Sequence, residues 1–304
     1  MRKIFNDEGL EQDFRKNGFV RVPFLTSTEV SELRELFFST LPSSGGQIRA
    51  EETGVEDAHF ISYDFTFIDK NIEYKREVFN LISSRFENQM NNLLDNYRPI
   101  IANYIRKKSA TGEVPLHQNW AFADEEKCTT VSIWCPLVDS TIENGTLQVV
   151  PGSHKRFGKY RGPMVPWELD QIKSSIINNY LVPLETKAGD CVILDDSIVH
   201  YSAINKTEGL RLAIQLICVP NEIPSIHYHL DQSVDSNKIK VLQVEDDFYM
   251  EFNPWKKPEN IKEIGSKHFS NKQLTEEEFV RGLKGKQFYN NGMFSKLLDI
   301  FKSI

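Results

Sequence analysis

Two histidines stand beside short β-rich runs in the middle of the chain. His117 follows Pro115, and His200 follows the apolar run at residues 191–195. Asn119 comes two residues after His117, and residues i and i+2 of a strand point to the same side. A His-x-Asp pair with a distant histidine is the arrangement that holds Fe(II) on one face. This spacing therefore indicates a metal site in which an amide stands at the place of the carboxylate.

A second set of histidines fits the same spacing literally. His229 and Asp231 form a His-x-Asp pair, and His227 stands two residues before it. Only His268 follows to complete a triad, and its polar segment does not have the pattern of a barrel strand. We expect these histidines to lie on the surface or in a lid.

The elements that must position these residues change in type along the chain. Helical patterns come first, at residues 8–16, after a capping box of Thr26 and Glu29, and from Val78 to Tyr97, with Pro99 soon after to end the helix. A strand-like run at 18–22 and later runs at 100–105, 129–137, 146–150, 191–195 and 211–219 are separated by turn signals. This order predicts an α+β domain in which helices back an antiparallel barrel or sandwich.

The motifs around the first set of histidines are similar to those of a known family. The segments HQNWAFADEEKCTTVSIWCPLVDSTIENGTLQVVPGSHK and AGDCVILDDSIVHYSAINKTEGLRLAIQL resemble the phytanoyl-CoA dioxygenase family of Fe(II)/2-oxoglutarate oxygenases. The similarity covers roughly residues 10–220. It implies a double-stranded β-helix, or jelly roll, in which His117 and His200 ligate Fe(II). Asn119 stands where the family has the ligand aspartate.

The same resemblance implies a site for 2-oxoglutarate. Arg211 matches the basic residue that binds the distal carboxylate of this cosubstrate, and a planar guanidinium suits a carboxylate. Trp134 matches an aromatic residue that lines the cosubstrate pocket, and Thr130 lies on the same strand face. Lys107, on the strand before the motif, is a candidate for a further pocket cation.

Asn119 is the departure from the family pattern, and three outcomes are open. Its oxygen can ligate iron, although an amide is neutral and a poorer ligand for a hard cation than a carboxylate. Alternatively the site has lost turnover, and the protein is a binding or regulatory protein on the same fold. In the third outcome Asn119 leaves a position for a halide, as in related halogenases. Asp124 and Glu125 stand too far along the chain to take the place two residues after His117.

The resemblance thus predicts a 2-oxoglutarate-dependent dioxygenase that uses Fe(II) and O₂ to hydroxylate a C–H bond of a small organic substrate. A metal-dependent isomerase would need further ligands, and Glu113 is the one nearby candidate. We expect residues 1–304 to form a single domain, with helical support about 1–99, a jelly-roll core about 100–220 and a lid and extension about 221–304. Lid segments are expected at 42–68, 155–180 and 221–255.

Composition limits the partners. The 304 residues carry a net charge of −7, without a Lys/Arg cluster of the kind that binds nucleic acid. No run of about 18 apolar residues predicts a membrane span, and the N-terminus does not have the pattern of a signal peptide. The four cysteines show no C-x-x-C pair. We therefore expect a cytoplasmic protein with reduced thiols and a small-molecule partner.

Overall fold

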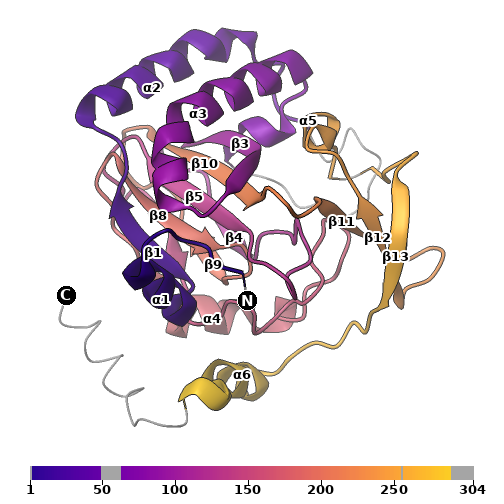
Figure 1. The fold of residues 1–304 in the computed structure, drawn as a ribbon. Helices are drawn as coiled ribbons and strands as arrows, with labels where there is room; N and C mark the ends of the chain where they lie inside the picture. Colours follow the sequence, from indigo (N-terminus) through magenta and orange to yellow (C-terminus); the bar gives the residue numbers. More distant parts are fainter. Residues whose placement is uncertain (1, 49–62, 255, 289–304) are drawn as a thin grey trace.

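The computed structural model describes residues 2–48, 63–254 and 256–288, with two antiparallel sheets at its centre (Figure 1). The first sheet consists of β1 (Phe19–Pro23), β2 (Asp64–Phe65), β3 (Tyr97–Lys107), β5 (Val131–Pro136), β8 (Asp190–Asp195) and β10 (Arg211–Pro220), in the order β1-β8-β5-β10-β3-β2. The second consists of β4 (Val114–His117), β6 (Gln148–Val149), β7 (Val182–Pro183) and β9 (His200–Ser202), in the order β4-β9-β6-β7.

The two sheets pack face to face as a jelly roll. Trp134 and Val192 of the six-stranded sheet belong to the same buried cluster as Val149 of the four-stranded sheet. Alternation along each strand directs one set of side chains inward and the other set outward. The predicted jelly-roll core is therefore confirmed.

Helices cover the outer face of the six-stranded sheet. α2 (Ser27–Thr40) and α3 (Ile72–Leu93) lie side by side over the sheet, and α1 (Glu8–Asn17) lies beside β1 (Figure 1). Phe37 and Val78 of the helices pack in one cluster with Tyr104 and Ile214 of the strands. The predicted capping box opens α2, because Glu29 accepts from the Thr26 amide at 2.7 Å while Thr26 Oγ1 accepts from the Glu29 amide at 3.3 Å.

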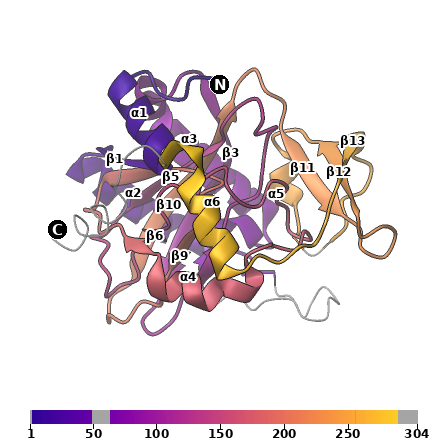
Figure 2. The same ribbon diagram turned by 90° about the horizontal axis from the view of Figure 1, so that it is seen from below.

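The opposite side of the barrel carries α4 (Lys173–Asn179) and α6 (Glu276–Phe288) (Figure 2). Ile176 and Phe279 of these helices pack against Leu116 and Val199 of the four-stranded sheet region. A three-stranded sheet of β11 (Ile226–Leu230), β12 (Lys238–Gln243) and β13 (Lys262–His268) stands at one side, with α5 (Phe248–Glu251) beside it. Among the described residues, short 3₁₀ helices are η1 (Leu41–Ser43), η3 (Thr66–Ile68) and η4 (Asp170–Ile172).

One predicted boundary is wrong. The helix expected to continue to Tyr97 ends at Leu93, and Tyr97 already begins β3. Pro99 lies inside this strand, at a position where the register with β10 shifts. Proline is tolerated at a bulge because its missing N–H interrupts no regular ladder.

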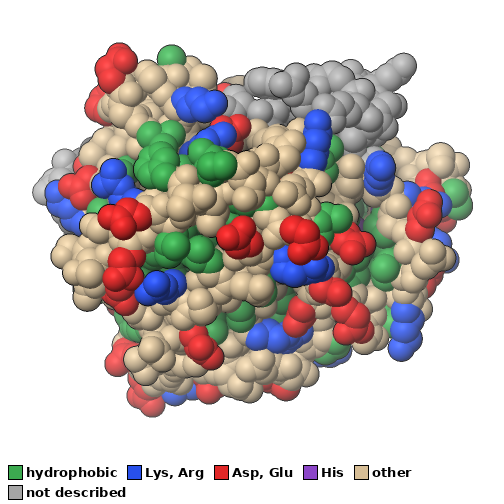
Figure 3. All heavy atoms as spheres, turned by 90° about the horizontal axis from the view of Figure 1, so that it is seen from above, with side chains coloured by type: hydrophobic (Ala, Val, Ile, Leu, Met, Phe, Trp, Pro, Cys, Tyr) green, Lys and Arg blue, Asp and Glu red, His purple; other side chains and the backbone are tan. Residues whose placement is uncertain are grey.

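Charged side chains of both signs lie on the surface, and the cysteines lie in the interior. On the face formed by α2 and α3, Lys and Arg side chains are interspersed with Asp and Glu (Figure 3). All four cysteines are buried and free. No helix within residues 2–48, 63–254 and 256–288 has the length and apolar character that crossing a membrane requires.

Candidate active site

Two histidines meet at the mouth of the barrel. His117 ends β4 and His200 begins β9, and the antiparallel register places them opposite each other. Their ring centroids lie 4.1 Å apart, with 51° between the ring planes. The fold therefore brings together the two histidines that the sequence predicts as metal ligands.

The hydrogen bonds of the two rings fix their tautomer. His117 Nδ1 lies 2.7 Å from the backbone oxygen of Pro115, and His200 Nδ1 lies 2.9 Å from that of Ile198. A carbonyl oxygen only accepts, so each Nδ1 carries the proton and each Nε2 keeps its lone pair. Burial lowers the pKa of both rings, so both are neutral at pH 7. Neutral imidazoles with a free Nε2 are the form that ligates a metal ion.

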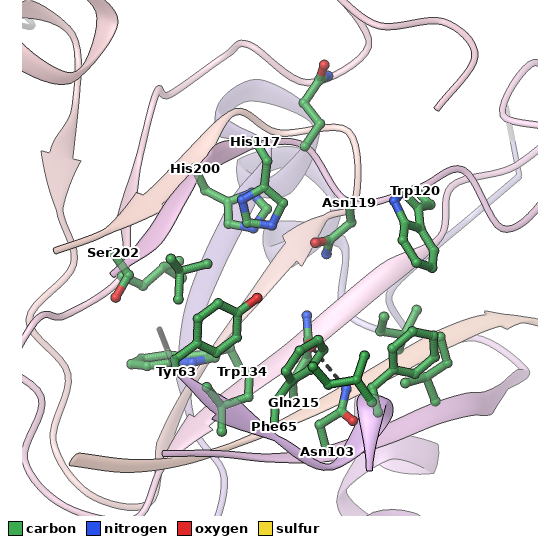
Figure 4. Close-up of a pocket in the computed structure, with 18 of the residues that line it drawn as sticks. Tyr63, Phe65, Asn103, His117, Asn119, Trp120, Trp134, His200, Ser202 and Gln215 are labelled. Atoms are coloured by element: carbon green, nitrogen blue, oxygen red, sulfur yellow. Dashed lines mark hydrogen bonds between the residues drawn. The ribbon is translucent and has the colours of Figure 1, made fainter. Parts of the chain in front are cut away.

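Asn119 points into the same space as the histidines (Figure 4). It is nearly buried, at 9% exposure. Its amide nitrogen donates to Ser132 Oγ at 3.0 Å and to Asp196 Oδ1 at 2.8 Å. With the nitrogen held in this way, the amide oxygen is turned toward the histidine rings. The third potential ligand atom is therefore a neutral oxygen.

Asp196 lies directly behind Asn119 and was missed by the sequence analysis. It follows β8, is fully buried, and also accepts a hydrogen bond from Ser132 Oγ at 2.6 Å. Burial raises the pKa of Asp196 to about 7, although its hydrogen bonds with Ser132 and Asn119 act in the opposite direction. A signal was present in the sequence, because two adjacent aspartates end an apolar run shortly before His200.

Arg211 is a buried cation without a counter-ion among the described residues. It begins β10 and is 2% exposed. Nη2 reaches Ser202 Oγ at 3.5 Å, Nε and Nη1 have no hydrogen-bond partner, and Cζ lies 5.8 Å from the centroid of the Trp134 ring. Burial lowers the pKa of Arg211 to about 9, which still leaves it charged at pH 7. A buried charge of this kind requires a partner, and the guanidinium geometry fits a carboxylate.

One cavity connects these groups (Figure 4). Its volume is about 330 Å³, and His117, Asn119, His200, Trp134 and Arg211 all line it. Aromatic side chains form much of the remaining wall: Tyr63, Phe65, Phe67, Trp120 and Phe122. A largely apolar cavity with a few converging polar groups is the usual form of a small-molecule site.

An amide pair interrupts the apolar wall. Asn103 on β3 and Gln215 on β10 are cross-strand partners, and Asn103 Nδ2 lies 3.4 Å from Gln215 Oε1. Both line the cavity, and the Oδ1 atom of Asn103 has no hydrogen-bond partner. Together with Arg211, these amides offer polar contacts to a bound molecule on the side of the six-stranded sheet.

Two predicted cosubstrate residues lie behind the cavity wall. Lys107 is fully buried, and its Nζ donates to the backbone oxygens of Ser202 at 3.1 Å and Ala203 at 2.6 Å and to the Ser202 hydroxyl. Burial and the nearby charge of Arg211 lower the pKa of Lys107 to about 6. Thr130 is fully buried beside Asp196. Neither residue lines the cavity, so their positions do not support a direct contact with a cosubstrate.

The other carboxylates near the motif are engaged elsewhere. Glu125 forms a bidentate ion pair with Arg161, with distances of 2.6 and 2.8 Å. Asp124 pairs with Lys127 at 3.0 Å. Glu113 accepts a hydrogen bond from the Tyr201 hydroxyl. Among the described residues, no three His, Cys, Asp or Glu side chains converge as a metal site. A metal here would rely on the two histidines and the Asn119 amide.

The second set of histidines lies outside this site. His227 and His229 are buried on β11, within the segment 221–255 that was expected as a lid, so the surface alternative is wrong for these two, whereas His268 is exposed on β13. The rings of Phe248 and Phe252 lie 5.5 and 5.0 Å from that of His227. Burial lowers the pKa of His227 to about 3. His227 and His229 therefore belong to the packing around the three-stranded sheet.

The donor set in the cavity fits a divalent metal ion together with a dicarboxylate. Two free imidazole nitrogens and an amide oxygen face one side of the cavity, and an unpaired guanidinium lies on another. A metal ion takes nitrogen and oxygen donors of this kind, and the guanidinium binds a carboxylate. The geometry therefore favours a metal-dependent site for an anionic cosubstrate.

Curated proteins with similar sequences carry the name of the family that the motifs resemble. A protein of Dictyostelium discoideum named phytanoyl-CoA dioxygenase domain-containing protein 1 homolog is 37% identical over 121 residues, which are 37% of this chain and 42% of that protein. Phytanoyl-CoA dioxygenase 1 of Oryza sativa subsp. japonica is 35% identical over 126 residues, which are 39% and 43% of the two chains. The matches span less than half the length of these relatives.

Solved structures share the fold. The non-heme alpha-ketoglutarate-dependent carbocyclase SnoK from nogalamycin biosynthesis has a TM-score of 0.52 at 19% identity, over 72% of this chain and 86% of that one. The epimerase SnoN, in complex with Fe³⁺, alpha-ketoglutarate and nogalamycin RO, has a TM-score of 0.52 at 18% identity, over 88% and 96%. Finally, the family model described as Phytanoyl-CoA dioxygenase (PhyH) matches residues 14–213, which is more than half of the chain. The chain therefore belongs to the phytanoyl-CoA dioxygenase family.

Proposed function

We propose that this protein is a non-haem iron, 2-oxoglutarate-dependent dioxygenase that hydroxylates a C–H bond of a small organic substrate. One observation carries the proposal: a histidine pair whose Nδ1 atoms are held by backbone oxygens and a buried guanidinium without a counter-ion among the described residues line the same cavity. In this proposal His117, His200 and the Asn119 oxygen hold Fe(II), and Arg211 binds the distal carboxylate of 2-oxoglutarate. Family membership and the SnoN complex with Fe³⁺ and alpha-ketoglutarate support this assignment.

The chain supplies position and environment. When bound, Fe(II) with 2-oxoglutarate supplies the activation of O₂ that the reaction requires. Arg211 and Trp134 fix the far end of the cosubstrate, because a guanidinium and an aromatic ring together define one orientation for its carboxylate. The aromatic wall excludes water and leaves the rest of the cavity to the substrate. Asn103 and Gln215 then provide hydrogen bonds that orient a polar group of that substrate.

The cavity wall also supports the predicted lid. Phe65, Pro163 and Pro254 come from the three segments expected to form it, and all three line the cavity. Residues 49–62 and 255 of these segments lie outside the described residues. We keep the division of residues 1–304 into support, core and lid of a single domain as part of this proposal.

The rival functions differ in what Asn119 does. A catalytically silent binding protein would retain metal and 2-oxoglutarate without turnover. The neutral amide favours this alternative, because it is a poorer ligand for a hard cation than a carboxylate. Halogenase-like chemistry would need an open ligand position for a halide. The hydrogen bonds that hold the Asn119 amide toward the histidines argue against such an opening.

The experiment is to measure succinate formed from 2-oxoglutarate by metal-free protein reloaded with Fe(II), with and without O₂. Slow turnover without substrate is sufficient, because succinate can be compared with the amount of protein over several hours. The proposal predicts O₂-dependent succinate in the native protein and none above background in Arg211→Met. Equal succinate in the two proteins would contradict it. A bound but unconverted cosubstrate would favour the binding protein.

A further inference from the structure

We propose that Asp196 is the carboxylate of this metal site, displaced one hydrogen bond from the ligand position and acting through Asn119. The inference rests on the proposed function and explains how an amide can stand where the family has an acid. Asp196 is a positioning residue in this proposal, since it reaches the metal only through the Asn119 side chain.

The first argument is the orientation of the amide. An asparagine side chain can present either its oxygen or its NH₂ group to the histidines, and only the oxygen can ligate a cation. Asp196 Oδ1 accepts from Asn119 Nδ2 at 2.8 Å, and Ser132 Oγ bridges the two by accepting from Asn119 at 3.0 Å and donating to Asp196 at 2.6 Å. This closed triangle leaves the oxygen as the atom that faces His117 and His200.

The second argument is charge. Asp196 is fully buried, it has no ion-pair partner among the described residues, and its Oδ2 atom has no hydrogen-bond partner. Arg161 donates to the backbone oxygen of Asn119, but its guanidinium is already paired with Glu125. A buried carboxylate without a cation is unfavourable unless a cation binds nearby. A metal ion on the Asn119 oxygen would be that cation.

The charge sum gives the same result. Fe²⁺ and doubly charged 2-oxoglutarate cancel, so an aspartate ligand leaves one negative charge and an asparagine ligand leaves none. Asp196 accepts from the Asn119 amide at 2.8 Å, so a carboxylate group lies one hydrogen bond from the proposed ligand oxygen. Outer carboxylates that orient metal ligands and raise their basicity typically change metal affinity by about 10–100-fold. Positions 119 and 196 are therefore an amide and carboxylate pair whose members should be exchangeable.

Exchangeability predicts an unusual mutational pattern. Asn119→Asp restores the family residue, yet in the metal-free protein it places two buried carboxylates in contact and removes the hydrogen bond. Asp196→Asn keeps an oxygen that can accept from Asn119 but removes the charge. The double variant Asn119→Asp/Asp196→Asn restores one carboxylate and one amide with the hydrogen bond reversed.

Asp195→Asn is the matched control. Asp195 is also buried and is the adjacent residue, but its carboxylate accepts from the Ser197 amide at 2.8 Å and from the Ser197 hydroxyl at 2.5 Å and does not contact Asn119. Loss of this carboxylate should lower the melting temperature without a large effect on metal affinity.

The test uses the full chain at pH 8 and two measurements: the melting temperature of the metal-free protein and the Kd for Fe(II), titrated without O₂ and with 2-oxoglutarate present. We expect Asp196→Asn to weaken Fe(II) binding by about tenfold or more, and Asp195→Asn by less than about threefold. Asn119→Asp should lower the melting temperature by several degrees, roughly 4 °C or more for a cost above 1 kcal/mol. The double variant should recover most of the Fe(II) affinity lost in Asp196→Asn and most of the melting temperature lost in Asn119→Asp.

Two results would overturn the proposal. One is equal Fe(II) affinity in Asp196→Asn and Asp195→Asn, which would make Asp196 merely structural. The other is a double variant whose change in melting temperature is only the sum of the changes in the two single variants, which would exclude coupling within the pair. If the unchanged protein binds no Fe(II), the proposed function fails and the metal role of Asp196 fails with it. The melting temperatures then still decide whether the pair is coupled.

Discussion

His117 and His200 occupy facing positions on β4 and β9, with ring centroids 4.1 Å apart and with both Nδ1 atoms held by backbone oxygens. In the proposed site, removing either ring removes a ligand rather than an outer contact. We expect His117→Ala and His200→Ala each to weaken Fe(II) binding by more than about 100-fold, since loss of an outer partner alone costs up to that amount. An anaerobic Fe(II) titration in a calorimeter measures the change in affinity.

His154→Gln provides the control for this prediction. His154 stands in the family motif PGSH, and its Nε2 lies 3.1 Å from the backbone oxygen of Arg15, away from the cavity. The variant should bind Fe(II) as the native protein does. Unchanged affinity in the His117 and His200 variants would mean that the metal binds elsewhere.

Arg211 is predicted to favour function at the expense of stability. Its charge is buried without a counter-ion, so Arg211→Met should raise the free energy of unfolding of the metal-free protein or leave it unchanged. The same change should remove about 2–5 kcal/mol of 2-oxoglutarate binding free energy. Denaturant unfolding and cosubstrate titration test the two effects separately.

Arg106→Met is the matched comparison for Arg211. Arg106 lies on the neighbouring strand β3, is partly exposed, and pairs with Asp64 at 2.5 Å outside the cavity. Its loss should leave 2-oxoglutarate affinity unchanged. A large loss of stability in Arg211→Met would indicate that its guanidinium has a structural partner instead.

Lys107 is predicted to hold the backbone and to make no direct contact with cosubstrate. Lys107→Met should lower the free energy of unfolding by about 1–3 kcal/mol for each carbonyl oxygen left unsatisfied, because Lys107 Nζ donates to those of Ser202 and Ala203. Affinity for 2-oxoglutarate in the folded variant should change little. The exposed neighbour Lys108, changed to Met, should affect neither quantity. A selective loss of cosubstrate binding would restore Lys107 as a pocket cation.

His227 predicts a pH dependence of stability. In the unfolded chain a histidine titrates near 6.5, whereas burial among Phe248 and Phe252 lowers the pKa of His227 to about 3. Between these values the unfolded chain binds more protons, so the free energy of unfolding falls as the pH falls below 6.5. One such group contributes up to about 1.4 kcal/mol per pH unit. The variant His227→Leu should reduce this slope in urea unfolding between pH 6.5 and 5, and the exposed His268→Gln should not. An equal slope in all three proteins would refute the assignment.

Local patterns predicted much of this molecule. The capping box of Thr26 and Glu29, the periodicity of α3 and the apolar runs of β8 and β10 are short-range signals, and each appears in the expected element. The end of α3 was harder to locate, because apolar residues at helical spacing continue to Tyr97 and that residue starts a strand instead. Tertiary context decides such boundaries more strongly than propensity.

In the candidate site, too, local motifs could be predicted from the sequence, whereas contacts between distant segments could not. His117, Asn119, His200 and Arg211 stand in recognisable motifs, and the fold brings all four to one cavity. The contact of Asn119 with Asp196 depends on how β4 and β8 face each other, and no spacing within either segment encodes it. Lys107 lies outside the cavity because its Nζ donates to the backbone oxygens of Ser202 and Ala203, and this contact between distant segments cannot be seen in the sequence.

The central claim is that the chain forms an iron and 2-oxoglutarate complex through an amide-containing ligand set. The most direct measurement is to add Fe(II) to metal-free protein without O₂, with 2-oxoglutarate present, and to record the visible metal-to-ligand charge-transfer band of the chelate. We predict the band in the native protein, its loss in His200→Ala and its marked weakening in Arg211→Met. Absence of the band in the native protein, at Fe(II) and 2-oxoglutarate concentrations that give it in the double variant Asn119→Asp/Asp196→Asn, would contradict the claim.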